Sequence, residues 1–282
     1  MRKAKHPSLR KVTATLEREA PLVEGDNGAA TIVVGGGRMR YVGADGCKLG
    51  WFAVMLAADG GWEAEVFPDV SSLWRKYSSA SVILIDIPIG LRERGHEERK
   101  CDRKARELLG PPRASSVFPA PSRSAIHARS YREAGDINER MTGRRLSLQT
   151  WSIIPKIREV DELLLSDKAA RLRVREIHPE ICFRAFAGHS MKHSKKRAEG
   201  RLERTRVLQS IYPATPGILE HARSAYRRKE VATDDILDAL VAAATGMLGG
   251  QRLVSIPEAP EFDSRGLRME MVYDPYHTVR DY

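Results

Sequence analysis

The sequence predicts an α/β fold in which helices and a sheet form layers, and three observations lead to this prediction. Three short strands separated by turns come first in the regularly patterned part of the chain. A short helix then leads into a continuous apolar strand, the pattern of a strand that is buried on both faces. Further along, one helix is apolar nearly all round. A meander that feeds a helix and then a parallel strand is typical of layered α/β domains.

The first elements follow from apolar periodicity. We expect strands at residues 39–44, 51–58 and 62–67, and the last of these alternates between apolar and polar residues as a half-buried strand does. A helix is predicted over residues 69–78. The apolar run that opens residues 81–90 predicts the next strand, at the centre of the sheet.

The later elements are mainly helical. Residues 91–172 are charged and helical in pattern, and they contain a loop with several prolines at 110–123. The other expected elements are a strand within 171–180, a basic stretch leading into a helix at 189–211, the apolar helix at 233–248, and a loop with a terminal strand at 258–273.

Length and local composition predict the domain organisation. The chain of 282 residues is long enough for one large domain. Its first 20 residues contain six Lys or Arg against two Glu, and three consecutive glycines follow before Met39. We therefore expect a basic, flexible N-terminal extension over residues 1–38. Residues 39–282 are expected to form a single domain with a helical insertion at about residues 91–172.

Charge and cysteine content restrict the partner and the location. The net charge of +10 favours an anionic partner, and nucleic acid is the first candidate. Cys47, Cys101 and Cys182 are odd in number and form no Cys-x-x-Cys pair, so we expect a reducing compartment and no disulfide framework. No apolar run approaches the roughly 20 residues of a membrane span, and the basic N-terminus lacks the apolar region of a secretory signal. These features predict a cytoplasmic protein without membrane segments and leave the oligomeric state open.

Two aspartates follow apolar strands, where a charge is costly unless something offsets it. Asp45 comes after Tyr-Val-Gly-Ala, and Asp86 comes after Val-Ile-Leu-Ile. Ligand sites in open α/β sheets form beyond the carboxyl ends of strands, so both side chains are expected at one edge. Three interpretations of Asp45 remain open: it holds a metal, Gly43 and Gly46 leave room for a phosphate, or Asp-Gly is simply a hairpin turn.

The apolar helix adds further carboxylates. Thr233 is a plausible N-cap, and Asp234 then suits the first turn and points away from the site. Asp235 and Asp238 are three residues apart and share one helix face. Asp238 has apolar neighbours and is expected to be buried. Two carboxylates in such a setting repel by roughly 4 kcal/mol at about 4 Å with an effective dielectric of about 20, and a divalent cation would remove this repulsion.

The candidate metal ligands are Asp45, Asp86, Asp235 and Asp238. Ligation by carboxylates alone suits Mg²⁺ or Mn²⁺, and two such ions about 4 Å apart would activate a water and stabilise an oxygen leaving phosphorus. Glu176 is a fifth candidate catalytic residue, as a base or an extra ligand, and it shares a strand with His178. The alternative is that His178 and Glu180 belong to an ordinary strand-to-helix turn.

Eight segments occur in order between Met39 and Met271. They are GADGCKLGW, DIPIGL, CDRKARELLG, SSVFPAP, SLQTWSIIPKIREVD, EIHPEICF, SKK and DDILDAL. Together they resemble the DUF429 family, whose members are described as predicted nucleases with a ribonuclease H-like fold. The resemblance implies a mixed five-stranded sheet in the order 3-2-1-4-5, flanked by helices, with the helical insertion between strands 4 and 5. In that order Asp45 and Asp86 lie side by side.

The segment DDILDALVAAATG also resembles the last helix of RuvC-type Holliday-junction resolvases, which carry an Asp-x-x-Asp-Ala-Leu pattern. This resemblance implies that Asp235 and Asp238 are metal ligands, with Asp45 as the aspartate of the first strand. The resolvases use Glu at the end of strand 4, where this chain has Asp86. Because Asp is one methylene shorter, the metal geometry is expected to differ at that position.

Basic residues near these motifs are candidates for binding nucleic acid. Lys and Arg side chains there would neutralise backbone phosphates. Trp151 and Phe118 could stack on a base, although Trp151 fits a core position better. The basic candidates are Lys156, Lys195, Lys196, Arg103 and Arg106, together with Arg113, Arg123 and Arg197.

These observations favour a metal-dependent nuclease that hydrolyses phosphodiester bonds of DNA or RNA. Two alternatives belong to other classes. An actin- or hexokinase-like phosphotransferase or nucleotide-binding protein would use the Asp-Gly-x-x-x-Gly pattern from Asp45 to Gly50 against phosphates. A nucleic-acid-binding module without catalysis would keep its binding in EDTA and show no cleavage in Mg²⁺.

Overall fold

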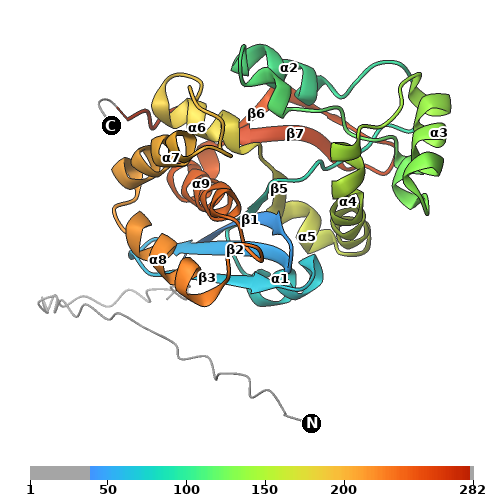
Figure 1. Cartoon of the computed structure of the whole chain (residues 1–282). Helices are drawn as coiled ribbons and strands as arrows, with labels where there is room; N and C mark the ends of the chain where they lie inside the picture. Colours follow the sequence, from blue (N-terminus) through green and yellow to red (C-terminus); the bar gives the residue numbers. More distant parts are fainter. Residues whose placement is uncertain (1–38, 280–282) are drawn as a thin grey trace, which may run out of the picture. The chain divides into compact units, whose positions relative to one another are not determined.

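A computed structural model describes residues 39–279 of the chain. The basic extension predicted for residues 1–38 lies outside the described residues. Figure 1 shows the arrangement of the helices and strands. None of the described helices combines the length and the apolar composition that crossing a membrane requires.

The central sheet has five strands in the order β3-β2-β1-β4-β5, which confirms the predicted order. The strands are β1 (Arg40–Cys47), β2 (Gly50–Ala57), β3 (Trp62–Phe67), β4 (Val82–Ile85) and β5 (Val174–Glu176). The first three form an antiparallel meander, while β4 runs parallel to both β1 and β5. This mixed α/β sheet is consistent with a ribonuclease H-like fold.

The hairpin between β1 and β2 turns later than Asp45. Asp45 pairs with Phe52, and Cys47 pairs with Gly50, so the turn lies at residues 48–49. The interpretation of Asp45 as part of a hairpin turn is therefore wrong. The strand continues through Asp45 because the ribbon that β1 forms with β2 extends beyond the end of β4.

The predicted helical insertion lies between β4 and β5. Its helices are α2 (Lys100–Leu109), η1 (Ala114–Ser116), η2 (Arg123–His127), α3 (Tyr131–Thr142), α4 (Leu148–Ser166) and α5 (Lys168–Arg173). The strand expected within 171–180 is shorter than predicted because α5 occupies its first residues. Asp167 starts that helix by accepting hydrogen bonds from the backbone N–H groups of Ala169 and Ala170.

Four helices follow β5, and a hairpin ends the described chain. The helices are α6 (Pro179–Ala187), α7 (Ala198–Ile211), α8 (Thr215–Ala225) and α9 (Thr233–Gly249), followed by the short η3 (Gly250–Arg252). The expected terminal strand is β7 (Arg268–Tyr273). It pairs with β6 (Val254–Phe262), a strand that was not predicted from the sequence.

Helices cover both faces of the sheet. Helix α1 (Val70–Tyr77) and α4 pack on one face with Val42 and Ala44 of β1. Helices α6 to α9 pack on the other face with Tyr41 of β1, and Figure 1 shows α9 lying along the middle of the sheet. Because side chains alternate along a strand, Gly43 and Asp45 share the α9 face with Tyr41.

Gly43 allows α9 to lie directly on β1. A Cβ atom at this position would overlap the backbone oxygen of Ala239 and the backbone nitrogen of Ala243, both in α9. The space beside Gly43 is therefore filled by the helix, and the expectation that Gly43 leaves room for a phosphate is wrong. This close approach sets the height of α9 above the strand that carries Asp45.

Candidate metal centre

Three of the predicted aspartates converge at one end of the sheet. Asp45, Asp86 and Asp238 each offer a carboxylate oxygen, and these oxygens lie within 4.8 Å of one another. We refer to these three residues as the acidic trio. Asp238 is 1% exposed, and the other two side chains are half-buried.

The strand register places Asp45 beside Asp86. Strands β1 and β4 are parallel neighbours, and the backbone N–H of Asp86 donates to the carbonyl of Ala44 at 3.0 Å. Asp86 continues the alternation of Val82 and Leu84, which both pack on the α9 side of the sheet. Both aspartates therefore face the helix that supplies Asp238.

Burial and mutual repulsion oppose ionisation of these carboxylates. Burial, followed by the charges of Asp86 and Asp238, raises the pKa of Asp45 well above its ordinary value. Burial also raises the pKa of Asp86 to about 7, although the charge of Lys195 partly offsets it. A centre with these properties is stabilised by any cation that enters it.

Lys195 already contributes one positive charge. Its Nζ lies 2.5 Å from Oδ2 of Asp238. Burial opposes the charge on Lys195, but Asp238, Asp45 and Asp86 together raise its pKa above the ordinary value. The second oxygen of Asp238, Oδ1, is buried and has no hydrogen-bond partner within residues 39–279.

Asp235 and Asp234 lie outside the acidic trio. Helix α9 begins at Thr233 with Ala232 as its N-cap, so the expectation that Thr233 is the N-cap is wrong. The Asp235 carboxylate instead reaches back and accepts a hydrogen bond from the N–H of Ala232 at 2.8 Å. Asp234, expected to point away from the site, is buried and pairs with Lys196 at 2.5 Å.

Glu176 does not join the acidic trio either. It shares a sheet face with Val174, which packs in the core on the α1 and α4 side. Its carboxylate accepts hydrogen bonds from both terminal nitrogens of Arg99 at 2.8 Å and from the N–H of Ile89 at 2.7 Å. Arg99 also pairs with Asp102. Its burial could not be predicted from the sequence, because most of the residues that follow it in α2 are charged.

The residues after β5 form a strand-to-helix turn. His178 is the N-cap of α6, and its Nε2 lies 3.3 Å from the carbonyl oxygen of Ser116. Burial lowers the pKa of His178 to about 4. Glu180 forms a buried ion pair with Arg204 at 2.5 Å. Of the two interpretations left open, these partners favour the ordinary turn over ligands of a metal.

The basic candidates differ in how free they are to bind phosphate. Lys156 lies over the ring of Trp51, with Nζ 4.7 Å from its centre, and contacts Glu159 at 3.3 Å. Arg103 is 61% exposed, whereas Arg106 donates to the carbonyl of Val117 and pairs with Glu98.

Arg123 is enclosed rather than exposed. It is 5% exposed and pairs with Asp161 at 2.6 Å and with Asp263 at 2.5 Å. The expectation that Arg123 contacts phosphate is therefore wrong, because the guanidinium joins helix α4 to the turn after β6. Trp151 packs partly buried against the core, as expected.

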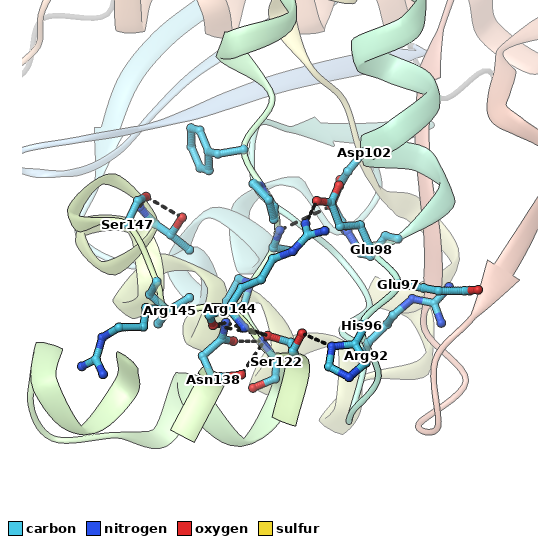
Figure 2. Close-up of a pocket in the computed structure, with 18 residues that line it drawn as sticks. Arg92, His96, Glu97, Glu98, Asp102, Ser122, Asn138, Arg144, Arg145 and Ser147 are labelled. Carbon is cyan, nitrogen blue, oxygen red and sulfur yellow. Dashed lines mark hydrogen bonds and ion pairs between the residues drawn. The ribbon is translucent and has the colours of Figure 1, made fainter. Parts of the chain in front are cut away.

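A separate cavity of about 160 Å³ lies within the helical insertion, and Figure 2 shows the side chains that line it. Arg99 and Asp102 contribute to its lining, as do Phe118, Ser122 and Leu146. The Ser122 hydroxyl is buried and lacks a hydrogen-bond partner in the part of the chain that the structure describes. No member of the acidic trio lines this cavity.

One family model matches the chain. It is described as "Protein of unknown function (DUF429)" and covers residues 43–261. The matched region contains all three members of the acidic trio together with Lys195. No curated protein and no solved structure matches the chain.

Proposed function

The chain belongs to the DUF429 family, which is described as proteins of unknown function. From the acidic trio, we propose that it is a metal-dependent nuclease that hydrolyses phosphodiester bonds of DNA or RNA. The observation that carries the proposal is Oδ1 of Asp238. This atom is buried and unpartnered within the described residues, and it belongs to a cluster of three carboxylates. A buried acceptor without a donor is costly, and a bound cation would satisfy it.

The donor set suits a hard divalent cation. Asp45, Asp86 and Asp238 supply oxygen only, and no His or Cys of residues 39–279 joins them. Such a set favours Mg²⁺ or Mn²⁺ over the metals that prefer nitrogen and sulfur. When bound, the ion would lower the pKa of a coordinated water and stabilise negative charge on a phosphoryl oxygen. The three carboxylates would hold that ion, and the sheet and α9 fix their positions.

Basic side chains around the trio support a phosphate-bearing substrate. Lys195 and Lys196 lie on one loop at the N-terminal end of α9, where each contacts an aspartate of that helix. Lys196 is 73% exposed, so its charge is available to a backbone phosphate. Lys156 lies beside Gly46 of β1, close to the trio. The three lysines would hold a polyanion over the carboxylates.

We also propose a cytoplasmic location, which the cysteines support. Cys47, Cys101 and Cys182 are all free thiols, as is typical of reducing compartments.

The test is cleavage by the purified protein with and without divalent metal. Single strands, duplexes, RNA–DNA hybrids and branched junctions should be offered in Mg²⁺, Mn²⁺, Ca²⁺ and EDTA. We expect cleavage of at least one substrate in Mg²⁺ or Mn²⁺, little in Ca²⁺, because Ca²⁺ takes a looser and higher coordination, and none in EDTA.

Asp45→Asn is the matched control for contaminating nucleases. It removes one ligand charge and should abolish cleavage, while nucleic-acid binding stays the same or improves because the variant presents one negative charge fewer to phosphate. Equal cleavage by Asp45→Asn and the wild type would contradict the proposal. Binding that persists in EDTA without any cleavage would instead favour the non-catalytic module.

A further inference from the structure

The loop that carries Lys195 is held in place by helix α7. The backbone N–H groups of Lys192 and His193 donate to the carboxylate of Glu203 in α7, at 2.8 and 3.0 Å. In the same helix, Arg204 donates to the carbonyl of His193 at 3.0 Å. The backbone that presents Lys195 is thus tied to α7, and its ammonium group is directed at α9.

The loop also lies in direct contact with α7. Gly200 is buried in that helix, and a Cβ atom there would overlap the carbonyl of Ser194. Only a glycine leaves the space that brings the loop this close. The packing of α7 therefore determines where Lys195 lies at the acidic trio. A lysine on a free surface loop would have no such fixed position.

The two oxygens of Asp238 have different roles. Oδ2 contacts the ammonium of Lys195 at 2.5 Å, while Oδ1 has no partner among residues 39–279. One oxygen is thus bound to a cation that the chain itself provides. The other remains for a ligand that the chain does not provide.

Each nearby carboxylate outside the trio has a partner of its own, although Oε2 of Glu180, like Oδ1 of Asp238, is buried without a partner among the described residues. The pairs are Asp234 with Lys196, Asp235 with the N–H of Ala232, Glu176 with Arg99, and Glu180 with Arg204. In the described part of the chain, the only group of three or more potential ligands in reach of one another is the acidic trio. A centre of two metal ions needs ligands that bridge or serve each ion, and this set suffices for one.

Charge balance also indicates a single divalent cation. The ionised trio carries three negative charges, which one divalent cation and the ammonium of Lys195 neutralise together. A second divalent cation beside Lys195 would leave an excess of positive charge in a partly buried site, where charge is poorly screened.

We propose that Lys195 takes the place of a second metal ion, so that the centre holds one divalent cation and one lysine. This inference rests on the proposed function, because it assumes that the trio binds metal. It adds that Lys195 provides the second positive charge of the centre, at a fixed position on the tethered loop.

The experiment is a titration of the full-length, metal-free protein with Mn²⁺. Binding is measured by calorimetry and by the electron paramagnetic resonance signal of free Mn²⁺. We expect the wild type to bind one Mn²⁺ per chain. Lys195→Ala should bind a second Mn²⁺ or bind the first with a Kd at least about tenfold lower, since about 1.4 kcal/mol of repulsion corresponds to that factor. Lys195→Arg keeps the cation and should bind one.

Lys192→Ala is the matched control, because it removes the same charge from an exposed position of the same loop. It should bind Mn²⁺ as the wild type does. Far-ultraviolet circular dichroism of each variant verifies folding, and Lys195→Arg keeps the test decisive if Lys195→Ala does not fold.

The outcomes separate this inference from the proposed function. Two Mn²⁺ ions in the wild type or in Lys195→Arg, or a folded Lys195→Ala indistinguishable from the wild type, would overturn the role of Lys195 and leave the metal-dependent nuclease standing. Absence of Mn²⁺ binding by the wild type would overturn both.

Discussion

At the scale of single residues, ionisation of the acidic trio destabilises the fold of the metal-free protein. Burial raises the pKa of Asp86 from 3.8 to about 7. A carboxylate with a raised folded pKa contributes stability that is fully present below its unfolded pKa and is lost as the pH rises through the folded pKa. Without metal, Asp86 therefore lowers the stability of the fold as the pH rises from about 4 to about 7.

The first prediction is that Asp86→Asn stabilises the metal-free protein at pH 8. The neutral amide avoids the cost of a buried charge, and the free energy of unfolding should rise by about 1–2 kcal/mol, allowing for the partial exposure of this side chain. At pH 5, where the folded wild type carries Asp86 mostly protonated, the gain should be much smaller. Urea denaturation in EDTA at the two pH values measures both. If the variant is no more stable than the wild type at pH 8, then the charge of Asp86 does not destabilise the metal-free fold.

Excess Mg²⁺ should reverse this order of stability. A ligand that binds only the folded state at 100 times its Kd stabilises it by about 2.7 kcal/mol. The wild type should gain this stability, and Asp86→Asn, with one ligand charge fewer, should gain much less. Stability gained at the expense of a functional site is a recurrent trade-off.

At the scale of elements, the trio depends on how closely α9 approaches β1. The helix lies against the strand at Gly43, where a side chain would overlap the backbone of Ala239 and Ala243. Asp238 is adjacent to Ala239 in the same turn, so the contact at Gly43 also determines the distance from Asp238 to Asp45.

The second prediction is that Gly43→Ala damages both stability and the metal centre. The added methyl group forces α9 away from β1, which should cost about 3 kcal/mol, at the upper end of the usual range for overpacking. Mn²⁺ binding should weaken as well, because Asp238 moves with the helix. Thermal denaturation and Mn²⁺ titration measure the two effects.

Gly46→Ala is the matched control for this substitution. A Cβ atom at Gly46 would lie 3.8 Å from Cγ of Lys156, which is an ordinary contact. This variant should therefore change stability by less than about 1 kcal/mol. Equal effects of the two substitutions would contradict the importance of the contact between α9 and β1.

The same elements explain what the sequence could predict. Asp45, Asp86 and Asp238 were identifiable because a charge placed among apolar residues needs an offset. The order of the strands came from the family resemblance. The face on which a side chain lies can be predicted only along an unbroken strand or helix. Glu176 lies on a strand of three residues, which is too short for the alternation of its side chains to be recognised in the sequence.

Competition between roles explains the position of Asp235. Spacing placed it on the same helix face as Asp238, but its place three residues after Ala232 also lets it cap the helix. Where the helix begins decides between these roles, and helix boundaries are the least certain feature of a sequence pattern. Lys195 could not be positioned because its loop is fixed by contacts with α7, which are distant in the chain from the trio.

At the scale of the whole molecule, the positive charge lies mostly outside the N-terminal segment. Residues 1–38 contain seven Lys or Arg and four Asp or Glu, so residues 39–282 retain +7 of the net charge of +10. The acidic trio and the three lysines proposed to hold phosphate all belong to this larger part. Metal binding and chemistry should therefore need only residues 39–282, whereas long-range attraction of a polyanion should use the whole chain.

The third prediction concerns a chain that starts at Met39. It should bind Mn²⁺ with the stoichiometry and Kd of the full-length protein and should cleave at the same rate when substrate is saturating. Its nucleic-acid affinity should fall, and the slope of log K against log salt should become shallower by about 0.9 for each duplex phosphate that the shorter chain no longer neutralises. Titrations of labelled duplex at several salt concentrations measure the slope. If the truncated chain stays folded yet does not bind Mn²⁺, then residues 1–38 contribute to the centre, and three carboxylates with one lysine are not the whole of it.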